Sequence, residues 1–201
     1  MNFKLKHISK LSDEELMIQL MDHHSDSALI ELHARYSKKL VGYFYKMLNK
    51  DSEKAQDFVQ DIFLKLMEKK HLFDPSKKFY TWIFTIAGNM CKTEYRNPYK
   101  ISISADEYEI SDVVFQENLA EKDLFNLLLE KSLNGLENHH KETFVLRFME
   151  HFSLQEIAEI TETSIGTVKS RLFYATQKMA KELKDYNPNN TKPYVFYVTM
   201  W

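Results

Sequence analysis

Cysteine, glycine and proline are scarce in this sequence: among 201 residues there are one cysteine, Cys91, 4 glycines and 4 prolines. A single thiol excludes an internal disulfide and is typical of a reducing cytoplasm. Few glycines and prolines, beside stretches rich in Leu, Glu, Lys and Met, favour helices over sheet. There is no uninterrupted apolar run of about 18 residues and no apolar core of a signal peptide near the N-terminus. We expect an all-α, cytoplasmic protein without membrane insertion.

Motifs for catalysis and for metal or cofactor binding are also lacking. The sequence has no glycine-rich phosphate loop and no Cys/His pair at metal-ligand spacing. The pairs His23-His24 and His139-His140 invite a metal, but adjacent side chains on a helix point about 100° apart and rarely share an ion. We therefore expect no metal, no cofactor and no catalytic residue, and an enzyme is the least favoured class of function.

The formal net charge is −2, which is unlike that of a protein that binds DNA tightly by itself. The charge is nevertheless segregated along the chain. Residues 101–121 contain six acids and no Lys or Arg, whereas residues 164–184 contain five cations and one acid. This distribution is typical of a protein whose DNA contact is local and whose affinity is completed by a larger partner.

The segment 153–172 predicts two short helices joined by a tight turn. Ser153 and Glu156 form a capping box at the first helix, and Thr163 or Ser164 can cap the second. Apolar residues at helical spacing turn inward, which leaves a polar and basic outer face. This is the layout of a helix-turn-helix whose second helix enters the DNA major groove. The residues predicted to contact duplex DNA are Ser164, Thr167, Lys169, Ser170 and Arg171.

Hydrophobic periodicity and helix breakers predict six more helices ahead of this motif. Their expected ranges are 12–21, 26–48, a helix from 52 that ends before a loop at 71–78, then 79–96, 117–133 and 141–149. The acidic, weakly periodic stretch in the middle predicts a linker. We expect two small helical domains joined by a flexible linker, the second a helix-turn-helix. The expected boundaries are 1–97 for the first domain, 98–117 for the linker, 118–185 for the second domain and 186–201 for a C-terminal tail.

The helix predicted over 79–96 is unusually aromatic. Its stripe includes Trp82, Ile83 and Ile86, which we expect to lie mostly in the core. Phe79 and Tyr80 remain as rings that can stack on unpaired bases. Capture of a single strand also needs polar groups to read the base edge and cations to hold the backbone. Candidates nearby are the loop 71–78, Asn89 and Lys92.

On the preceding helix, Asp57, Gln60 and Asp61 share a polar face opposite an apolar stripe. Such a face is most often only solvated. Two carboxylates one helical turn apart can also pair with cations on the helices of a partner.

Two separate segments of this chain resemble one family, in the order in which that family carries them. The first includes Ala55–Leu66 and Phe79–Asn89, and the second includes Phe144–Arg147 and Gly166–Leu172. The chain resembles bacterial sigma factors of the sigma-70 family, specifically the short extracytoplasmic-function (ECF) group that retains only two domains, regions 2 and 4.

The resemblance implies a dissociable, non-catalytic specificity subunit of RNA polymerase. By resemblance, 1–97 is the region 2 domain, which binds a coiled coil on the polymerase's largest subunit and captures the melted −10 element. Region 4, at 118–185, binds the β-subunit flap and reads the duplex −35 element. Family members are commonly restrained by an anti-sigma factor, which makes such a protein a further expected partner beside core polymerase and promoter DNA.

The resemblance also implies roles for single residues. The face formed by Asp57, Gln60 and Asp61 becomes the polymerase-docking surface. The loop before Phe79, together with Asn89, becomes the pocket for a flipped −10 base. The residues implied in single-strand contact are Lys77, Lys78, Phe79, Tyr80, Asn89, Lys92 and Arg96.

The sequence departs from the family within the turn of the helix-turn-helix. Thr161-Glu162-Thr163 stands where the family usually has an apolar residue, glycine and another apolar residue. Glycine is favoured there because the turn needs a positive φ, and Glu162 costs on the order of 1 kcal/mol in that conformation. The main rival interpretation is a helix-turn-helix regulator that binds a palindromic operator as a dimer, without polymerase.

Overall fold

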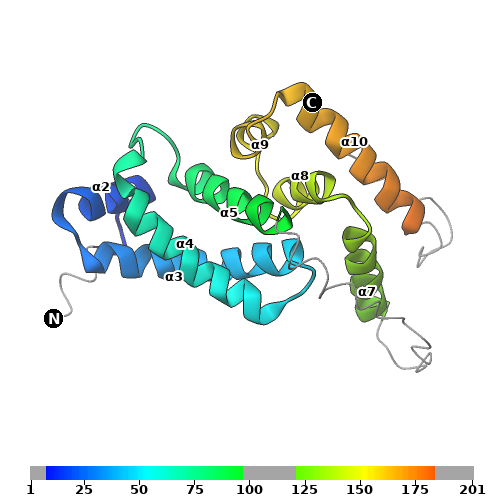
Figure 1. Ribbon diagram of the computed structural model, residues 1–201, viewed down its shortest axis with the longest axis horizontal. Coiled ribbons are helices and arrows are strands. Elements are labelled where there is room, and N and C mark those ends of the chain that lie inside the picture. Colours follow the sequence, from blue (N-terminus) through cyan, green and yellow to red (C-terminus); the bar gives the residue numbers. More distant parts are fainter. Residues whose placement is uncertain (1–7, 97–120, 184–201) are drawn as a thin grey trace. The chain divides into compact units, whose positions relative to one another are not determined.

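The computed structural model describes residues 8–96 and 121–183, with side chains in the second range from Leu127 onward (Figure 1). Its elements are α2 (Asp13–His23), α3 (Asp26–Met47), α4 (Ser52–Lys69), the 3-10 turn η1 (Lys70–Leu72), α5 (Phe79–Tyr95), α7 (Glu121–Asn134), α8 (Asn138–Phe148), α9 (Leu154–Thr161) and α10 (Ile165–Glu182). No strand occurs in the described ranges, and the all-α prediction is confirmed. The predicted linker at 98–117 and tail at 186–201 lie outside the described residues.

The chain forms two compact units, of which the first contains α2 to α5 and the second contains α7, α8 and α10. The helix boundaries agree with the sequence to within a few residues. The largest shifts are at α7, which begins four residues later than expected, and at α8, which begins three residues earlier. Among the described helices, none is long and apolar enough to cross a membrane.

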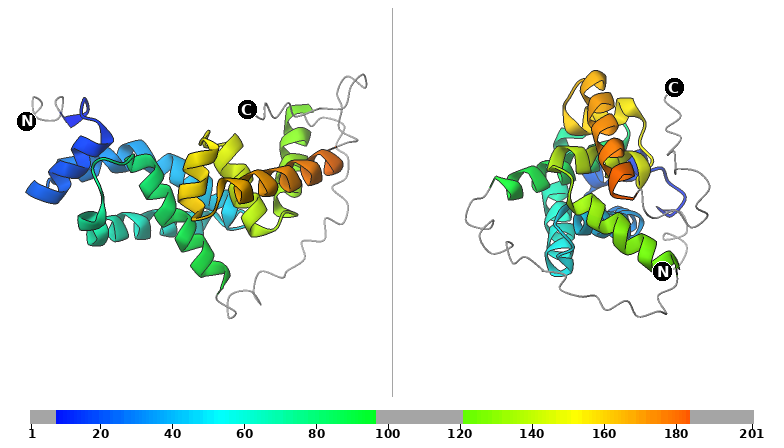
Figure 2. Two further views of the ribbon diagram at one scale, coloured as in Figure 1. Left: turned by 90° about the horizontal axis from the view of Figure 1, so that it is seen from above. Right: turned by 90° about the vertical axis from the view of Figure 1, so that its right-hand side faces the viewer.

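In the first unit, α3 and α4 lie side by side and run in opposite directions (Figures 1 and 2). The four-residue connection, 48–51, reverses the direction of the chain because Asn49 and Lys50 take positive φ values of 54° and 70°. The Asp51 carboxylate then accepts a hydrogen bond of 2.9 Å from the Lys54 amide and caps α4. The break predicted at this position is confirmed.

The start of α2 is held by local and tertiary hydrogen bonds. Ser12 and Glu15 form the predicted capping box. The Asp13 carboxylate accepts a hydrogen bond from the Tyr36 hydroxyl and pairs with the Arg35 guanidinium at 2.7 Å. Burial of Tyr36 and its bond to Asp13 raise the pKa of the phenol well above its ordinary value. This network ties α2 to the middle of α3.

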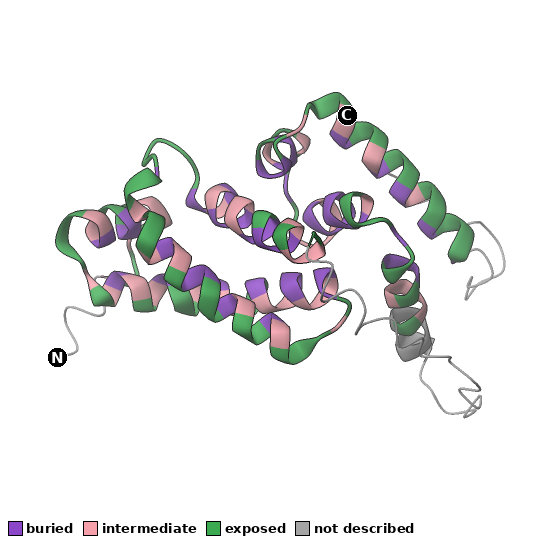
Figure 3. Cartoon of the chain, viewed as in Figure 1, coloured by how far each residue is buried: buried purple, intermediate pink, exposed green. Residues whose placement is uncertain are grey.

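The core of the first unit contains several aromatic side chains, and the buried faces of its helices turn toward one another (Figure 3). The Tyr36 and Phe79 ring centroids are 5.1 Å apart in an edge-on arrangement. Tyr43 meets Phe84 in the same way at 5.2 Å. Such pairs contribute about 0.5–1.5 kcal/mol beyond the burial of their area. Side chains of α3 therefore determine which face of α5 is buried.

In the second unit, α10 packs on α8 and α7. A side chain of α8 holds the turn between α8 and α9, because the Arg147 guanidinium donates a hydrogen bond of 2.9 Å to the Phe152 carbonyl. The Ser153–Glu156 capping box predicted at α9 is present, with the Glu156 amide donating to the Ser153 hydroxyl at 3.2 Å. These contacts set where α9 begins.

Replacement of Phe79 tests how far the first unit depends on the α5 core. Phe79 is fully buried, so Phe79→Ala should lower the free energy of unfolding by about 3–5 kcal/mol through lost burial and a cavity. Urea unfolding followed by far-UV circular dichroism measures the change. Leu72→Ala, at a side chain that is 63% exposed, is the control and should change stability by less than about 0.5 kcal/mol. Equal effects of the two variants would contradict this assignment of the core.

Candidate nucleic-acid interface

The turn ahead of α10 has the backbone conformation that the sequence analysis expects. Glu162 has a φ of 55°, which is the left-handed region that favours glycine. The Ser164 hydroxyl then accepts a hydrogen bond of 3.1 Å from the Thr167 amide and caps α10. Glu162 therefore makes the turn at a conformational cost, and Ser164 is the cap.

The outward face of α10 carries the residues predicted to contact duplex DNA. Ser164, Lys169 and Ser170 are exposed, whereas Thr167 and Arg171 are half-buried. The opposite face holds the buried side chains Val168, Leu172, Ala175 and Met179. The inward and outward assignment is confirmed, while contact with DNA stays a prediction.

The hydroxyl groups on this face are partly engaged within the helix. The Ser164 and Thr167 hydroxyl oxygens are 2.9 Å apart, and the Ser170 hydroxyl donates to the Thr167 carbonyl at 2.9 Å. Their remaining hydrogen-bonding capacity is therefore reduced. Lys169 and Arg171 provide the positive charge that phosphate contacts require.

Two large side chains extend this face beyond the predicted set. Phe173 is 55% exposed and Tyr174 is 56% exposed. Phe173 lies four residues after Lys169 and three after Ser170, and this spacing puts it on the same side of the helix. This spacing could have been recognised in the sequence. The α10 surface therefore consists of the predicted DNA-contacting residues together with the rings of Phe173 and Tyr174.

The predicted docking face on α4 is present. Asp57, Gln60 and Asp61 are all exposed. Leu64, which is not among the predicted docking residues, is 63% exposed. It lies four residues after Gln60 and three after Asp61 and so shares their side of the helix. The α4 surface, defined by Asp57, Gln60, Asp61 and Leu64, combines two carboxylates with one apolar side chain.

The expectation that the Phe79 ring faces a base is wrong. Phe79 is fully buried, because its ring packs against Tyr36, Phe73 and Trp82. Its amide donates a hydrogen bond of 2.9 Å to the Glu14 carboxylate, which caps the start of α5. Phe79 therefore anchors the start of α5 in the core and does not offer its ring to an unpaired base.

The burial of the other aromatic and aliphatic side chains on α5 differs in part from the prediction. Trp82 and Ile86 are half-buried, whereas Ile83 is fully buried as expected. Tyr80 is half-buried, and the Lys39 ammonium lies 4.8 Å from its ring centroid. A base that stacks on this face of Tyr80 has to displace Lys39.

The loop ahead of α5 is structured by a local turn. The Asp74 carboxylate accepts hydrogen bonds from the Ser76 hydroxyl at 2.7 Å and from the Ser76 amide at 3.0 Å. These bonds hold the pKa of Asp74 below its ordinary value. Lys77 and Lys78 follow this turn and are exposed. The loop thus presents two cations at the beginning of the helix.

Asn89, Lys92 and Arg96 belong to the other end of α5. Asn89 and Arg96 are exposed and Lys92 is half-buried, with the Lys92 ammonium 3.4 Å from the Asn89 side-chain oxygen. Asn89 lies ten residues after Phe79, which corresponds to a rise of about 15 Å along a helix. A pocket formed by the loop and Asn89 together stays a prediction.

Two protein families match separate segments of the sequence. Sigma-70 region 2 matches residues 32–98, which include most of α3 and all of α4 and α5. Sigma-70, region 4 matches residues 126–179, which end within α10. The order of the two matches is the one expected from the motifs.

Known proteins similar to this chain span both segments. The sequence is 27% identical over 186 residues to the ECF RNA polymerase sigma-E factor of Haemophilus influenzae, covering 87% of this chain and 97% of that protein. It is 28% identical over 162 residues to the ECF RNA polymerase sigma factor SigW of Bacillus subtilis, covering 75% and 86%. A solved structure of the sigma factor RpoE in complex with the anti-sigma factor NepR, from Bartonella quintana, has a TM-score of 0.61 at 24% identity, covering 78% of this chain and 97% of that chain. This last similarity shows a shared fold.

Replacement of Glu162 tests the cost of the turn. An L-residue in the left-handed region costs about 1–2 kcal/mol, whereas glycine loses about 0.5–1 kcal/mol to its greater freedom when unfolded. Glu162→Gly should therefore raise the free energy of unfolding by about 0.5–1 kcal/mol in thermal or urea denaturation. Glu159→Gly, at an exposed position within α9, is the control and should lower it by about 1 kcal/mol. Destabilisation by both variants would show that Glu162 makes a compensating contact.

Proposed function

This chain belongs to the sigma-70 family, in its extracytoplasmic-function group, and on that premise we propose that it is a non-catalytic specificity subunit that directs core RNA polymerase to promoters. The carrying observation is the order of the two matches, region 2 followed by region 4, on two compact helical units. We assign residues 1–97 to polymerase binding and the −10 element, and residues 118–185 to the −35 element.

The α4 surface docks on core polymerase, and the coiled coil of the largest subunit is its partner. Asp57 and Asp61 attract cations of that partner and steer the encounter. Leu64 is a large apolar side chain next to these carboxylates, and such a side chain contributes most when a partner covers it. The surface therefore combines electrostatic steering with an apolar anchor. In the second unit, the β flap is the partner.

The −10 element is captured along α5. Lys77 and Lys78 hold the backbone of the displaced strand at one end of the helix, and Lys92 and Arg96 hold it at the other. Tyr80 supplies a ring and Asn89 supplies a polar group that can read a base edge. Because these groups lie along the length of a helix, they contact several successive nucleotides.

Promoter opening then follows from binding energy alone. Stacking of a base on an aromatic side chain contributes roughly 1–3 kcal/mol, which is comparable to the few kcal/mol needed to unstack that base. Trapping bases that leave the duplex shifts the promoter from its closed to its open form. Core polymerase performs nucleotide addition, so no catalytic residue is required here.

The −35 element is read as duplex by α10. Ser164, Thr167 and Ser170 supply hydroxyl groups near the start of the helix, and Lys169 and Arg171 supply charge. An anti-sigma factor is a further proposed partner, because the similar RpoE of Bartonella quintana has been solved with one.

Run-off transcription with purified core polymerase tests the proposed function. The purified chain should be monomeric and inert alone, yet direct initiation from a specific promoter once core polymerase is added. A chain that forms a stable dimer, occupies a palindromic site without polymerase and directs no initiation would be the rival regulator.

The α4 surface can be tested by single replacements. Asp61→Ala and Leu64→Ala should each weaken core binding tenfold or more, since a hot-spot residue costs about 2 kcal/mol or more on truncation. Affinity is measured by competition for labelled core polymerase. Ile30→Ala is the matched control, because Ile30 on α3 is also 63% exposed. The assignment fails if the Ile30 variant loses as much affinity as the α4 variants.

The α10 surface can be tested on a duplex fragment that carries only the −35 element. Lys169→Ala and Arg171→Ala should weaken binding of the polymerase complex, and each lost phosphate contact should reduce the salt slope by about 0.9. A salt series of fragment binding measures both effects. Lys131→Ala, at an exposed position of α7, is the control. Unchanged slopes in both α10 variants would remove these cations from the interface.

A further inference from the structure

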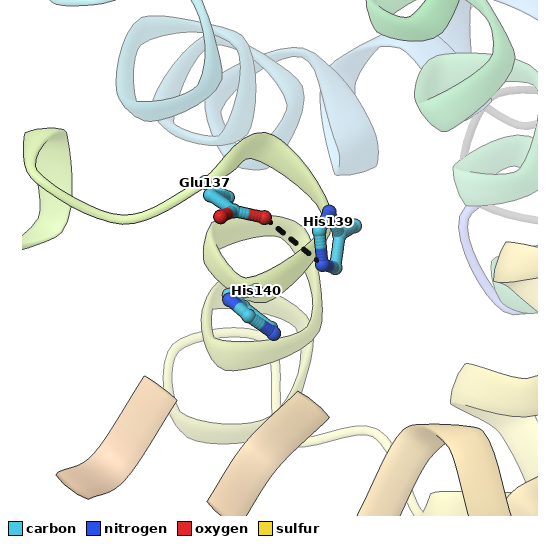
Figure 4. Close-up of side chains that lie close together, drawn as sticks. All are labelled: Glu137, His139 and His140. Atoms are coloured by element: carbon cyan, nitrogen blue, oxygen red, sulfur yellow. Dashed lines mark ion pairs between the residues drawn. The ribbon is translucent and has the colours of Figure 1, made fainter. Parts of the chain in front are cut away.

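Three potential metal ligands meet at the start of α8. Glu137 is the N-cap of this helix, and His139 and His140 lie in its first turn. Figure 4 shows the Glu137 carboxylate directed at the His139 ring, with His140 on the same turn of the helix. Within residues 8–96 and 121–183, these side chains form a group whose donor atoms all lie within 4.8 Å of one another.

One distance within this group matches that of two ligands around one ion. The His139 Nε2 and Glu137 Oε2 atoms are 3.4 Å apart, which is longer than an ordinary N–H···O hydrogen bond of about 2.7–3.2 Å. Two ligand atoms at about 2.0–2.1 Å from a tetrahedral zinc ion lie about 3.3–3.4 Å apart. Adjacent side chains on a helix usually diverge, but the His139 and His140 ring centroids are only 4.1 Å apart. This pair therefore departs from the divergence that helical geometry predicts.

The Glu137 side chain is available for this role. An N-cap side chain normally accepts a hydrogen bond from the first turn of its helix, but the Glu137 carboxylate makes no such bond. It is also 71% exposed, so ligation requires little desolvation of this group.

We infer that Glu137, His139 and His140 bind one divalent transition-metal ion of the zinc class. Two imidazoles and one carboxylate are a donor set that suits Zn²⁺, Co²⁺ and Ni²⁺ and disfavours Ca²⁺ and Mg²⁺, which prefer oxygen ligands. Three protein ligands leave a fourth position, which water occupies. This site is independent of the proposed transcriptional function.

The site also touches α10. The His140 and Tyr174 ring centroids are 6.0 Å apart, and Tyr174 is on the exposed side of α10. The proposed site therefore lies next to the helix that carries the cations proposed to contact duplex DNA.

Titration of the full-length chain, free of any histidine tag, with Zn²⁺ tests the site. We expect one equivalent of Zn²⁺ per chain by calorimetry. With Co²⁺ as the probe, we expect the visible absorption band of a site with low coordination number. Glu137→Gln should weaken binding at least tenfold, and the double variant His139→Gln/His140→Gln should abolish it.

The chain offers a matched control. His23 and His24 are also adjacent, but within the described residues no third donor completes a group with them. The double variant His23→Gln/His24→Gln should therefore bind Zn²⁺ like the unaltered chain. Circular dichroism verifies that each variant is folded.

Three results would overturn the site. The first is the absence of stoichiometric Zn²⁺ binding by the unaltered chain, and the second is binding that survives in the folded His139→Gln/His140→Gln variant. The third is a loss of binding in the His23→Gln/His24→Gln variant that equals the loss at α8. None of these results bears on run-off transcription, which tests the other proposal separately.

Discussion

The Phe79 ring packs edge-on against Tyr36 of α3, and this contact orients the whole of α5. Once Phe79, Ile83 and Phe84 are buried, the side of α5 that remains accessible is determined by the helical repeat. Asn89 is exposed because it lies on that side. The polar surface proposed to hold a single strand is therefore a consequence of the aromatic core beneath it. A change in that core would reorient the surface without touching any of its own residues.

The helix limits were largely predictable because they depend on neighbours in the sequence. Ser12, Ser153 and Ser164 each accept a hydrogen bond from an amide three residues later, and this chemistry needs no information from the rest of the fold. The positive φ of Glu162 was expected from the resemblance, because the family usually has glycine at this position of the turn. Local signals thus predicted the limits of the helices, and the resemblance predicted the conformation of this one residue.

The burial of particular side chains on α5 was not predictable in the same way. Periodicity identifies the apolar residues that share one face of a helix. It does not predict how much of that face the neighbouring helices bury. Trp82 and Ile86 lie at the edge of the buried face of α5 and are half-buried. The Phe79 ring packs against Tyr36, which is 43 residues earlier in the sequence, and against Phe73 of the preceding loop. For the same reason, the exposure of Leu64 became visible only once the partners of α4 were known.

The number of cations on α10 available to phosphate is smaller than the sequence suggests. Lys178 donates a hydrogen bond to the Gly135 carbonyl, so its ammonium group has fewer hydrogen bonds left to offer to a phosphate. Arg171 is half-buried, which limits its reach. Each phosphate contact contributes in proportion to the counterions it releases, so a helix with few free cations binds duplex DNA weakly alone. Weak binding of duplex DNA by α10 alone is the physical reason for the proposed dependence of promoter recognition on core polymerase.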